Sequence, residues 1–250
     1  MPSTKAYRQR IYGSYVSAQD DPPPATAADF SASARYLRRI VARHLPADRE
    51  ATVLDLGCGH GTLLHFLKQA GYRNIGGVDG SMEQVALAAR LGVDNVVHGD
   101  LFGTLAEQPD ASLDVVVAFD VLEHLERDEA LALVDAVRRT LKPGGRFLIH
   151  TPNAESPFFG RIRYGDLTHE MAYTRTSLAQ LFGASGFGPV ACFEDVPAPG
   201  SLKGTLRFCL WKLLRLALRL CLAVETGDTG ARAIFSQNLL CVAYKPEARA

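Results

Sequence analysis

The residues best suited to ligand chemistry form the short run Asp55-Leu56-Gly57-Cys58-Gly59-His60-Gly61. Three glycines at every second position let the backbone approach a ligand that any Cβ atom would block. The dinucleotide fingerprint has a different spacing, G-x-G-x-x-G, and places a pyrophosphate on a helix N-terminus. Asp55 would repel such a phosphate, because both groups are negatively charged. The run therefore favours a ligand that carries positive charge, and the alternative is an ordinary turn between a strand and a helix.

A second acidic residue, Asp79, follows the glycine run by about 20 residues, at the end of the next predicted strand. Parallel strands end at the same edge of a sheet, so Asp79 would stand beside the glycine run. There its carboxylate can accept both hydroxyls of a ribose. The alternative for an isolated aspartate at a strand end is a helix cap.

The elements that must position these residues alternate along the chain as strand, helix, strand. A helix with apolar residues at helical spacing is predicted over 30–45, and others follow the glycine run and cover 131–141. Strands are predicted at 53–56, 74–79, 95–98, 113–119, 146–150, 188–194 and 238–244. The run 113–119 is almost wholly apolar, as expected for a central parallel strand that is covered on both faces. The pattern predicts an α/β fold with a doubly wound parallel sheet.

Several motifs in this order resemble those of the class I S-adenosylmethionine-dependent methyltransferases, in particular those acting on small molecules and glycans. They read VLDLGCGHG, GVDGS, GDLF, FDVLEHL and LKPGGRFLI, and the match runs from Ala51 to His150. The resemblance implies a seven-stranded Rossmann-like sheet whose last strand is antiparallel, and S-adenosylmethionine as the cofactor. It also implies that the cofactor is held by Asp55, Gly57, Cys58, Gly59, Asp79, Gly80, Asp100, Leu101 and Phe119.

Transfer of a methyl group to a hydroxyl oxygen needs a base, and histidine is the natural one near neutral pH. His124, His150 and His169 are the candidates near strand ends, and His169 is the predicted catalytic residue because Asp166 and Glu170 flank it.

No metal is predicted. The alternative is a divalent ion at Asp120, Glu123 and His124, as a similar motif provides in ubiquinone-type O-methyltransferases. Transfer to nitrogen would need no strong base and stays open.

The segment 151–187 contains GDLTHEMAYTRTSLAQLFGASGF, which resembles the substrate side of many small-molecule and glycan methyltransferases. A sugar or glycan acceptor is therefore expected. A group of cationic and aromatic residues in this segment could hold a phosphate on that acceptor or could be a solvated basic loop: Arg161, Arg163, Tyr164 and Arg175. Two different functions also stay open: methylation of a phenolic or quinone precursor, and non-catalytic binding of the cofactor together with a partner protein.

An insertion over 197–236 separates the last two predicted strands and is too long for a simple loop. Its core, 202–224, is a strongly apolar helix with one predicted basic stripe formed by Lys203, Arg207, Lys212, Arg215 and Arg219. Its wide apolar face could pack on the fold, form a homodimer or lie on an anionic membrane surface. At the other end, residues 1–29 are predicted to be an arm, either a flexible tail or a lid, before a single domain over 30–250.

Composition excludes some classes of function. The 27 basic and 27 acidic residues balance, so no nucleic-acid partner is expected. The five cysteines are scattered without a C-x-x-C pair, the first 20 residues lack the apolar core of a secretion signal, and no run of about 18 uncharged apolar residues occurs. A cytoplasmic location is expected, with peripheral contact at the inner membrane face left open.

Overall fold

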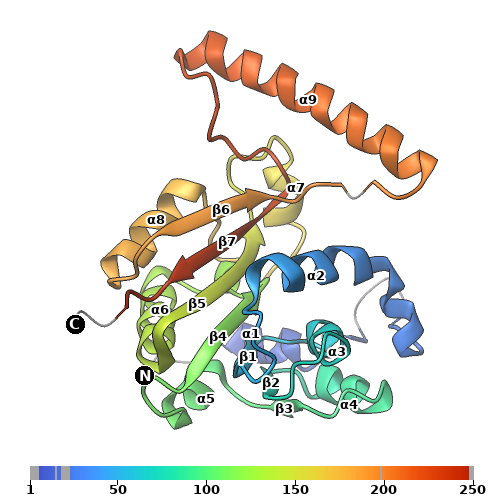
Figure 1. Ribbon diagram of the computed structural model, residues 1–250, viewed down its shortest axis with the longest axis vertical. Coiled ribbons are helices and arrows are strands. Elements are labelled where there is room, and N and C mark those ends of the chain that lie inside the picture. Colours follow the sequence, from blue (N-terminus) through green and yellow to red (C-terminus); the bar gives the residue numbers. More distant parts are fainter. Residues whose placement is uncertain (1–5, 15, 18–22, 198, 248–250) are drawn as a thin grey trace.

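The computed structural model describes residues 6–14, 16–17, 23–197 and 199–247. One seven-stranded sheet crosses the molecule in the order β3-β2-β1-β4-β5-β7-β6 (Figure 1). The strands are β1 (Val53–Leu56), β2 (Ile75–Asp79), β3 (Val96–His98), β4 (Leu113–Phe119), β5 (Leu141–Pro152), β6 (Val190–Glu194) and β7 (Asn238–Tyr244). The α/β fold predicted from the alternating pattern is confirmed.

Helices lie on both faces of this sheet (Figure 1). The helices in the described residues are α1 (Ala6–Tyr12), α2 (Ser31–His44), α3 (Thr62–Gln69), α4 (Met82–Arg90), α5 (Leu101–Glu107), α6 (Arg127–Thr140), α7 (Phe159–Arg163), α8 (Arg175–Ala184) and α9 (Leu202–Thr226). Two short 3-10 turns, η1 (Ala27–Phe30) and η2 (Leu122–His124), complete the set. The sheet is therefore doubly wound, as the order of the elements predicted.

Two apolar cores hold the layers together, one on each face of the sheet. Val115 and Val117 of β4 point to the core shared with α2, α3 and α4. Their neighbours Val116 and Ala118 point to the opposite core, shared with α5, α6 and α8. Because successive side chains of a strand alternate between faces, a strand covered on both sides must be apolar throughout. This explains the unbroken apolar run that the sequence showed.

The direction of the last strands decides where the loops meet. β7 pairs antiparallel with both β5 and β6, which confirms the predicted antiparallel last strand. β6 consequently runs in the same direction as β5, so the carboxyl ends of β1, β4, β5 and β6 lie along one edge of the sheet. The residues with predicted chemistry follow these ends, and the loops at this edge are where α/β sheets bind ligands.

One strand begins earlier than the sequence predicted. The residues Lys142-Pro143-Gly144-Gly145, expected as a turn, belong to β5. They form a bulge, because the pairing with β4 moves from Leu113 opposite Leu141 to Val115 opposite Arg146. Gly144 has a φ of 72°, a left-handed conformation that favours glycine. The glycines thus shape an irregular strand and do not end it.

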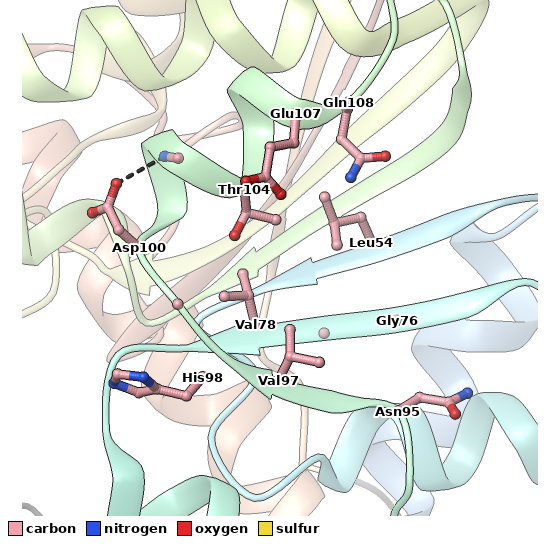
Figure 2. A pocket seen from close by; sticks show the side chains of 13 residues that line it. Leu54, Gly76, Val78, Asn95, Val97, His98, Asp100, Thr104, Glu107 and Gln108 are labelled. Atoms are coloured by element: carbon pink, nitrogen blue, oxygen red, sulfur yellow. Dashed lines mark hydrogen bonds between the residues drawn. The ribbon is translucent and has the colours of Figure 1, made fainter.

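The sheet leaves a hollow of about 400 Å³ between β2, β3 and α5 (Figure 2). Its floor includes Leu54, Gly76 and Val78, and Val97 of β3 borders it. α5 is short and Gly76 has no side chain, so this corner of the sheet is incompletely covered. Asp55 and the glycine run do not line it, but its lining reaches His98 and Asp100 at the carboxyl end of β3.

Two adjacent glycines of β2 provide a matched test of the packing. A Cβ atom on Gly77 would lie 2.6 Å from Cys58 Sγ and 2.8 Å from Leu64 Cδ1, whereas a Cβ atom on Gly76 would have no neighbour within 4 Å. We expect Gly77→Ala to lower the free energy of unfolding by about 1–3 kcal/mol, because the core must shift to admit the methyl group. Gly76→Ala should change it by less than about 0.5 kcal/mol. Urea unfolding of both variants measures the difference, and equal stabilities would contradict the packing described.

Candidate functional site

The glycine run turns the chain sharply between β1 and α3. Gly57 and Gly59 have φ values of 68° and 55°, in the left-handed region that side chains disfavour. A Cβ atom on Gly57 would also lie 2.5 Å from Val121 Cγ2, so the turn packs directly against the loop after β4. The amides of Gly57 and Cys58 both donate to the carbonyl oxygen of Val78. The turn is thereby fixed to β2 through backbone contacts, and Cys58 takes part through its amide.

Asp55 lies at the start of this turn with an exposed fraction of only 3%. Burial, and then the neighbouring charge of Asp79, raises the pKa of its carboxyl group to about 8. Among the described residues, no side chain or amide hydrogen-bonds to this carboxyl group. A buried carboxylate without a partner is costly, and a cation at this position would relieve that cost. The geometry therefore fits a ligand with a positively charged group.

Asp79 connects the turn to the end of β2. One carboxylate oxygen accepts from the Gly59 amide at 2.8 Å, and the other accepts from the Ser81 amide at 2.8 Å. Ser81 itself is the N-cap of α4, where its side chain accepts from the Gln84 amide. The helix-cap role considered for Asp79 is thus filled by Ser81. Asp79 lies beside the glycine turn, where its predicted role toward a ribose requires it.

The predicted adenine contacts lie at the next strand end. Asp100 is the N-cap of α5, and its carboxylate accepts from the Gly103 amide at 2.8 Å (Figure 2). Leu101 is the first residue of α5 and packs against the core on that side of the sheet. Asp100 remains exposed to solvent, so its carboxylate keeps lone pairs for a ligand. Their role toward an adenine stays a prediction.

Gly80 and Phe119 complete the predicted cofactor set. The Gly80 carbonyl oxygen lies 3.2 Å from His98 Nε2, at the end of β2. Phe119 is the last residue of β4, with its ring centroid 5.7 Å from that of His150. All of the predicted cofactor residues therefore lie at the carboxyl ends of β1 to β4. That shared edge is the arrangement the motifs implied.

A buried histidine joins two carboxylates across the same edge. His150 Nδ1 lies 2.8 Å from Asp120, and its Nε2 lies 2.8 Å from Asp195, which also accepts from the Tyr36 hydroxyl at 2.8 Å. Burial alone would lower the pKa of His150, but the two carboxylates outweigh it and hold this pKa well above its usual value. Both ring nitrogens carry protons in that state. His150 is thus unsuited to take a proton from the substrate that receives the methyl group, and it instead holds Asp120 in place.

No local sequence pattern indicated this triad. Asp195 and Tyr36 are far from His150 in the chain, and only the position of β6 and α2 brings them together. Asp120 has a φ of 55°, which is strained for a residue with a side chain. The ion pair with His150 helps to hold this strained backbone at the end of β4.

The other two candidate histidines lie together, with ring centroids 4.8 Å apart. His169 Nδ1 lies 3.1 Å from the carbonyl oxygen of Ile162. A carbonyl oxygen can only accept, so Nδ1 is the donor in this contact. In the neutral tautomer that this bond selects, Nε2 is the nitrogen that can accept a proton.

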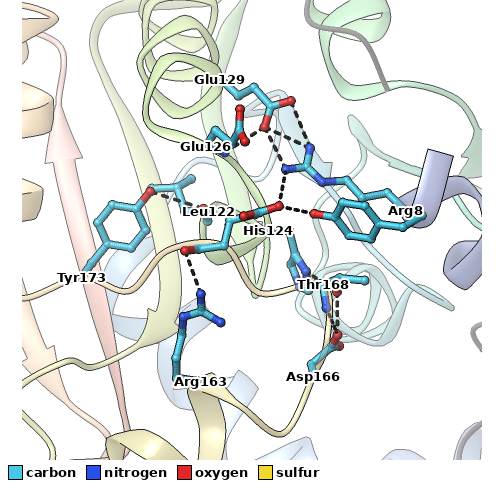
Figure 3. A network of polar contacts seen from close by, with 11 residues as sticks. Arg8, Leu122, His124, Glu126, Glu129, Arg163, Asp166, Thr168 and Tyr173 are labelled. Atoms are coloured by element: carbon cyan, nitrogen blue, oxygen red, sulfur yellow. Dashed lines mark hydrogen bonds and ion pairs between the residues drawn. The ribbon is translucent and has the colours of Figure 1, made fainter. Parts of the chain in front are cut away.

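His124 has the same tautomer. Its Nδ1 lies 2.8 Å from Thr168 Oγ1, and that hydroxyl donates to Asp166 at 2.6 Å. Since the hydroxyl proton goes to Asp166, the Thr168 oxygen accepts from His124 (Figure 3). Burial, and then the neighbouring His169, lowers the pKa of His124 to about 4. His124 is thus a neutral and weak base beside His169.

Glu123 completes this cluster on its buried side. Its carboxylate accepts from the Thr151 hydroxyl at 3.0 Å, and burial raises its pKa to about 8. One ligand atom each from Glu123, His124 and His169 lie within 4.8 Å of one another. The metal site considered from the sequence had Asp120 in place of His169, and this member is corrected, because Asp120 is turned toward His150.

The N-terminal arm contributes α1 to the same region (Figure 3). Arg8 is buried and forms a bidentate ion pair with Glu129 of α6, with N–O distances of 2.9 and 3.0 Å. The Tyr7 hydroxyl donates to Glu170, and the Tyr12 ring meets the His124 ring edge-on at 6.4 Å. The sequence left a tail and a lid open for this arm. In the structure, α1 of this arm lies against His124 and Glu170.

The predicted phosphate-binding group is dispersed in the structure. Arg163 donates to the carbonyl oxygen of Glu170 at 2.9 Å and lies over the Tyr164 ring, so it braces the loop. Arg175 opens α8, which packs against β6. Arg161 and Tyr164 are exposed. Arg163 and Arg175 thus belong to different elements, and a role of this group toward a phosphate stays a prediction.

Comparison with known proteins agrees with this geometry. The family model of the methyltransferase domain matches residues 30–191. A probable S-adenosylmethionine-dependent methyltransferase of Mycolicibacterium smegmatis is 37% identical over 136 residues, covering 54% of this chain and 51% of the relative. A ubiquinone biosynthesis O-methyltransferase of Xylella fastidiosa is 35% identical over 108 residues, covering 41% of this chain and 42% of the relative.

Among solved structures, a SAM-dependent methyltransferase from Archaeoglobus fulgidus superposes with a TM-score of 0.63, covering 87% of this chain and 96% of that one. At 22% identity this likeness concerns the fold alone. The chain spans about half the length of the curated relatives it matches. The family match covers most of the described sheet, and the glycine turn, Asp55 and Asp79 lie within it. This chain therefore belongs to the methyltransferase domain family, as a class I, S-adenosylmethionine-dependent member.

Proposed function

We propose that this protein transfers a methyl group from S-adenosylmethionine to a hydroxyl oxygen of a sugar or glycan-type acceptor. The observation that carries the proposal is the hydrogen bond from His169 Nδ1 to the Ile162 carbonyl oxygen, which leaves Nε2 as the nitrogen that can accept a proton. His169 lies in the segment that follows β5, at the same edge of the sheet as the glycine turn. A base at this position can take the proton of an acceptor hydroxyl.

The cofactor supplies an activated methyl group on a positively charged sulfur atom. Asp55 would face the cationic methionine end, because its carboxyl group is buried and has no protein partner among the described residues. Asp79 would accept from the ribose, and Asp100, Leu101 and the Phe119 backbone would border the adenine. Gly57, Cys58, Gly59 and Gly80 would let the backbone approach the ligand. These residues hold the cofactor in line with the acceptor, which is the main contribution such an enzyme makes.

The acceptor would bind between the loop after β5 and α1. His169, Thr168 and Asp166 supply polar atoms on one side, and Tyr12 lies against His124 on the other. The resemblance of residues 151–187 to the substrate side of glycan methyltransferases supports a sugar. We propose that the arm over 1–29 is a lid, because the Arg8–Glu129 ion pair anchors α1 beside this space. We also propose that the acceptor carries a phosphate or a lipid, and the case for the lipid depends on how α9 is used.

A second candidate is O-methylation of a phenolic or quinone precursor with a bound metal ion. The observation that favours it is the cluster of Glu123, His124 and His169, two imidazole nitrogens and one carboxylate, whose ligand atoms lie within 4.8 Å. This donor set fits a divalent transition metal better than Mg²⁺, because Mg²⁺ prefers oxygen ligands. The similarity to a ubiquinone biosynthesis O-methyltransferase points in the same direction. Here the three residues would bind the ion, and the ion would orient the phenolic oxygen.

An acceptor panel separates these proposals. The full-length protein is incubated with S-adenosylmethionine and either nucleotide sugars, other glycans, phenols or amines, and methylated products are identified by mass spectrometry. We expect methylated sugar hydroxyls whose formation survives EDTA treatment. Transfer to phenols alone, lost with EDTA and restored by added metal, would favour the second candidate. Tight cofactor binding without any product would indicate a non-catalytic protein, and methylated amines would overturn the assignment to oxygen.

The role of His169 predicts a specific kinetic defect. We expect His169→Ala and His169→Gln to reduce kcat by about 10²–10⁴-fold, the usual contribution of a general base. The affinity for S-adenosylmethionine, measured by calorimetry, should stay within about twofold because His169 does not line the glycine turn. His65→Ala on α3 is the control and should retain full turnover. Near wild-type kcat in both His169 variants would refute the assignment, and a loss confined to His124→Gln would transfer the role to His124.

The raised pKa of Asp55 predicts that cofactor affinity depends on pH. Only the ionised carboxylate attracts a cation, so affinity should rise by roughly tenfold between pH 7 and pH 9 as Asp55 ionises with its pKa of about 8. Without cofactor, the raised pKa acts on folding stability in the opposite sense. The folded protein keeps a proton on Asp55 that the unfolded chain has already released, so the free energy of unfolding falls as pH rises, and this contribution is lost once pH passes about 8. Asp55→Asn should remove this part of the pH dependence of both quantities.

Isothermal titration calorimetry at several pH values measures this dependence, and two buffers with different ionisation enthalpies report the proton released on binding. The comparison between wild type and Asp55→Asn isolates the residue, because titration of the cofactor itself is common to both proteins. Parallel pH profiles for the two proteins would contradict the role of Asp55.

A further inference from the structure

The helix α9 carries a long apolar face that no part of the described chain covers. Figure 1 shows α9 held away from the sheet, beyond its carboxyl edge. The exposed fractions of Leu202, Leu213 and Val224 are 89%, 63% and 79%. Other exposed side chains on the same face are Leu206, Leu210, Leu216 and Leu220. Monomeric proteins rarely leave so large a continuous apolar surface in water, and such surfaces mark interaction sites.

The opposite face fixes the orientation of α9. Arg215 is buried and pairs with Glu194 at the end of β6, with an N–O distance of 2.9 Å. Arg215 also lies over the Trp211 ring at 4.5 Å, and the Trp211 ring stacks on Phe208. The Glu194 carboxylate additionally accepts from the Phe235 amide at 2.8 Å. These contacts turn the aromatic side of α9 toward the protein and the leucine side outward.

The cations of α9 lie along both borders of the leucine face. At 3.6 residues per turn, Lys203 and Arg207 lie on one side of it, and Lys212 and Arg219 lie on the other. The single basic stripe predicted from sequence is therefore corrected, since Arg215 points inward and the other four cations divide. The residues from 202 to 224 contain no aspartate or glutamate. An apolar face bordered by cations on both sides is the arrangement of helices that lie in the surface of anionic membranes.

A second set of cations lies beside α9. A groove of about 770 Å³ runs between α2 and the first turns of α9. Its lining includes Arg35, Arg38, Arg39 and Arg207, and no carboxylate belongs to that lining among the described residues. The planar guanidinium group of arginine can bind a phosphate group through two parallel hydrogen bonds. The groove therefore offers a binding place for a phosphate headgroup beside the apolar helix α9.

A second copy of this chain is a poorer partner for the same face. Pairing two copies of α9 through their leucines would bring the bordering cations of one helix against those of the other. No acidic side chain between 202 and 224 could compensate this repulsion. A bilayer with anionic lipids satisfies both features, because acyl chains accept the leucines and headgroups accept the cations. No helix in the described residues is long and apolar enough to cross a bilayer, so the contact would be on its surface.

We propose that α9 lies in the surface of an anionic lipid bilayer and that the groove between α2 and α9 binds lipid phosphate groups. α9 connects β6 to β7 at the carboxyl edge of the sheet, so this docking would place His169 and the glycine turn close to the membrane. An acceptor attached to a lipid would reach the site from that side. The docking does not depend on methyl transfer, and binding measurements test it separately.

Vesicle flotation tests the proposal with the full-length protein. Vesicles contain either phosphatidylcholine alone or phosphatidylcholine with about 30% phosphatidylglycerol, an amount chosen to give roughly the surface charge of natural anionic membranes. We expect flotation with the anionic vesicles at low salt, and a decrease of at least about fivefold in about 0.5 M salt, where charges are screened. Absence of flotation with anionic vesicles, or equal flotation with both kinds, would overturn the proposal.

Variants separate the apolar and basic contributions. Leu213→Glu combined with Leu220→Glu should reduce binding by at least about tenfold, because two leucines that would enter the acyl chains are lost and two anions are added. Leu131→Glu is the control, since Leu131 is 42% exposed but belongs to α6. Arg35→Gln combined with Arg207→Gln should weaken binding to anionic vesicles several-fold. Cofactor affinity, measured in parallel, should stay unchanged and shows that the variants are folded.

The mass of the protein in solution, from light scattering, tests the second copy as an occupant. A monomer at micromolar concentration is the expected result. A dimer that dissociates in the Leu213→Glu, Leu220→Glu variant would assign the leucine face to a second copy and would overturn the membrane proposal. Vesicle binding that this variant retains in full would overturn it as well.

Discussion

The rest of the site depends on one costly arrangement, two carboxyl groups held near each other at the ends of β1 and β2. Asp79 is compensated by the amides of Gly59 and Ser81, whereas buried Asp55 has no such partner in the described chain. The protein meets this cost by raising the pKa of Asp55 to about 8, so that the group is largely neutral without a ligand. In the function proposed above, a cationic ligand would restore this charge, and the attraction would add to the binding energy. The left-handed glycines would let such a ligand come close to the backbone and reach Asp55.

The three histidines at the same edge differ in the partners of their ring nitrogens, and this difference suits one of them to a structural role and the others to proton transfer. His150 lies between Asp120 and Asp195 and stays protonated, so it acts as a fixed ionic link between β4, β5 and the end of β6. His124 and His169 instead donate from Nδ1 to a hydroxyl and to a carbonyl oxygen. Nε2 is then the nitrogen that can take a proton, which is what the proposed base requires.

The sequence predicted those features that local patterns determine. The strands, the glycine turn and the cap-like acids at strand ends follow from alternation, glycine spacing and turn chemistry, and the structure placed them where expected. The Asp120–His150–Asp195 triad and the contact of α1 with Glu129 and Glu170 join segments distant in sequence, so no local pattern could indicate them. Proximity in sequence also says little about the arginines of this segment, because Arg163 ends α7 whereas Arg175 begins α8. For α9 the periodicity was right, but its orientation depended on a single distant residue, Glu194.

Two buried ion pairs attach the added segments to the rest of the fold. Arg8–Glu129 joins α1 to α6, and Arg215–Glu194 joins α9 to the end of β6. Removing two charges from water cancels much of their attraction, so such pairs add little net stability compared with apolar contacts. Loss of one partner is nevertheless costly, because the other charge is left buried, and this selects one orientation over others. For α9 that selection is decisive: its aromatic side faces the protein through Arg215, and its leucines must therefore face outward. One salt bridge thus turns an insertion between two strands into a helix whose apolar face is exposed.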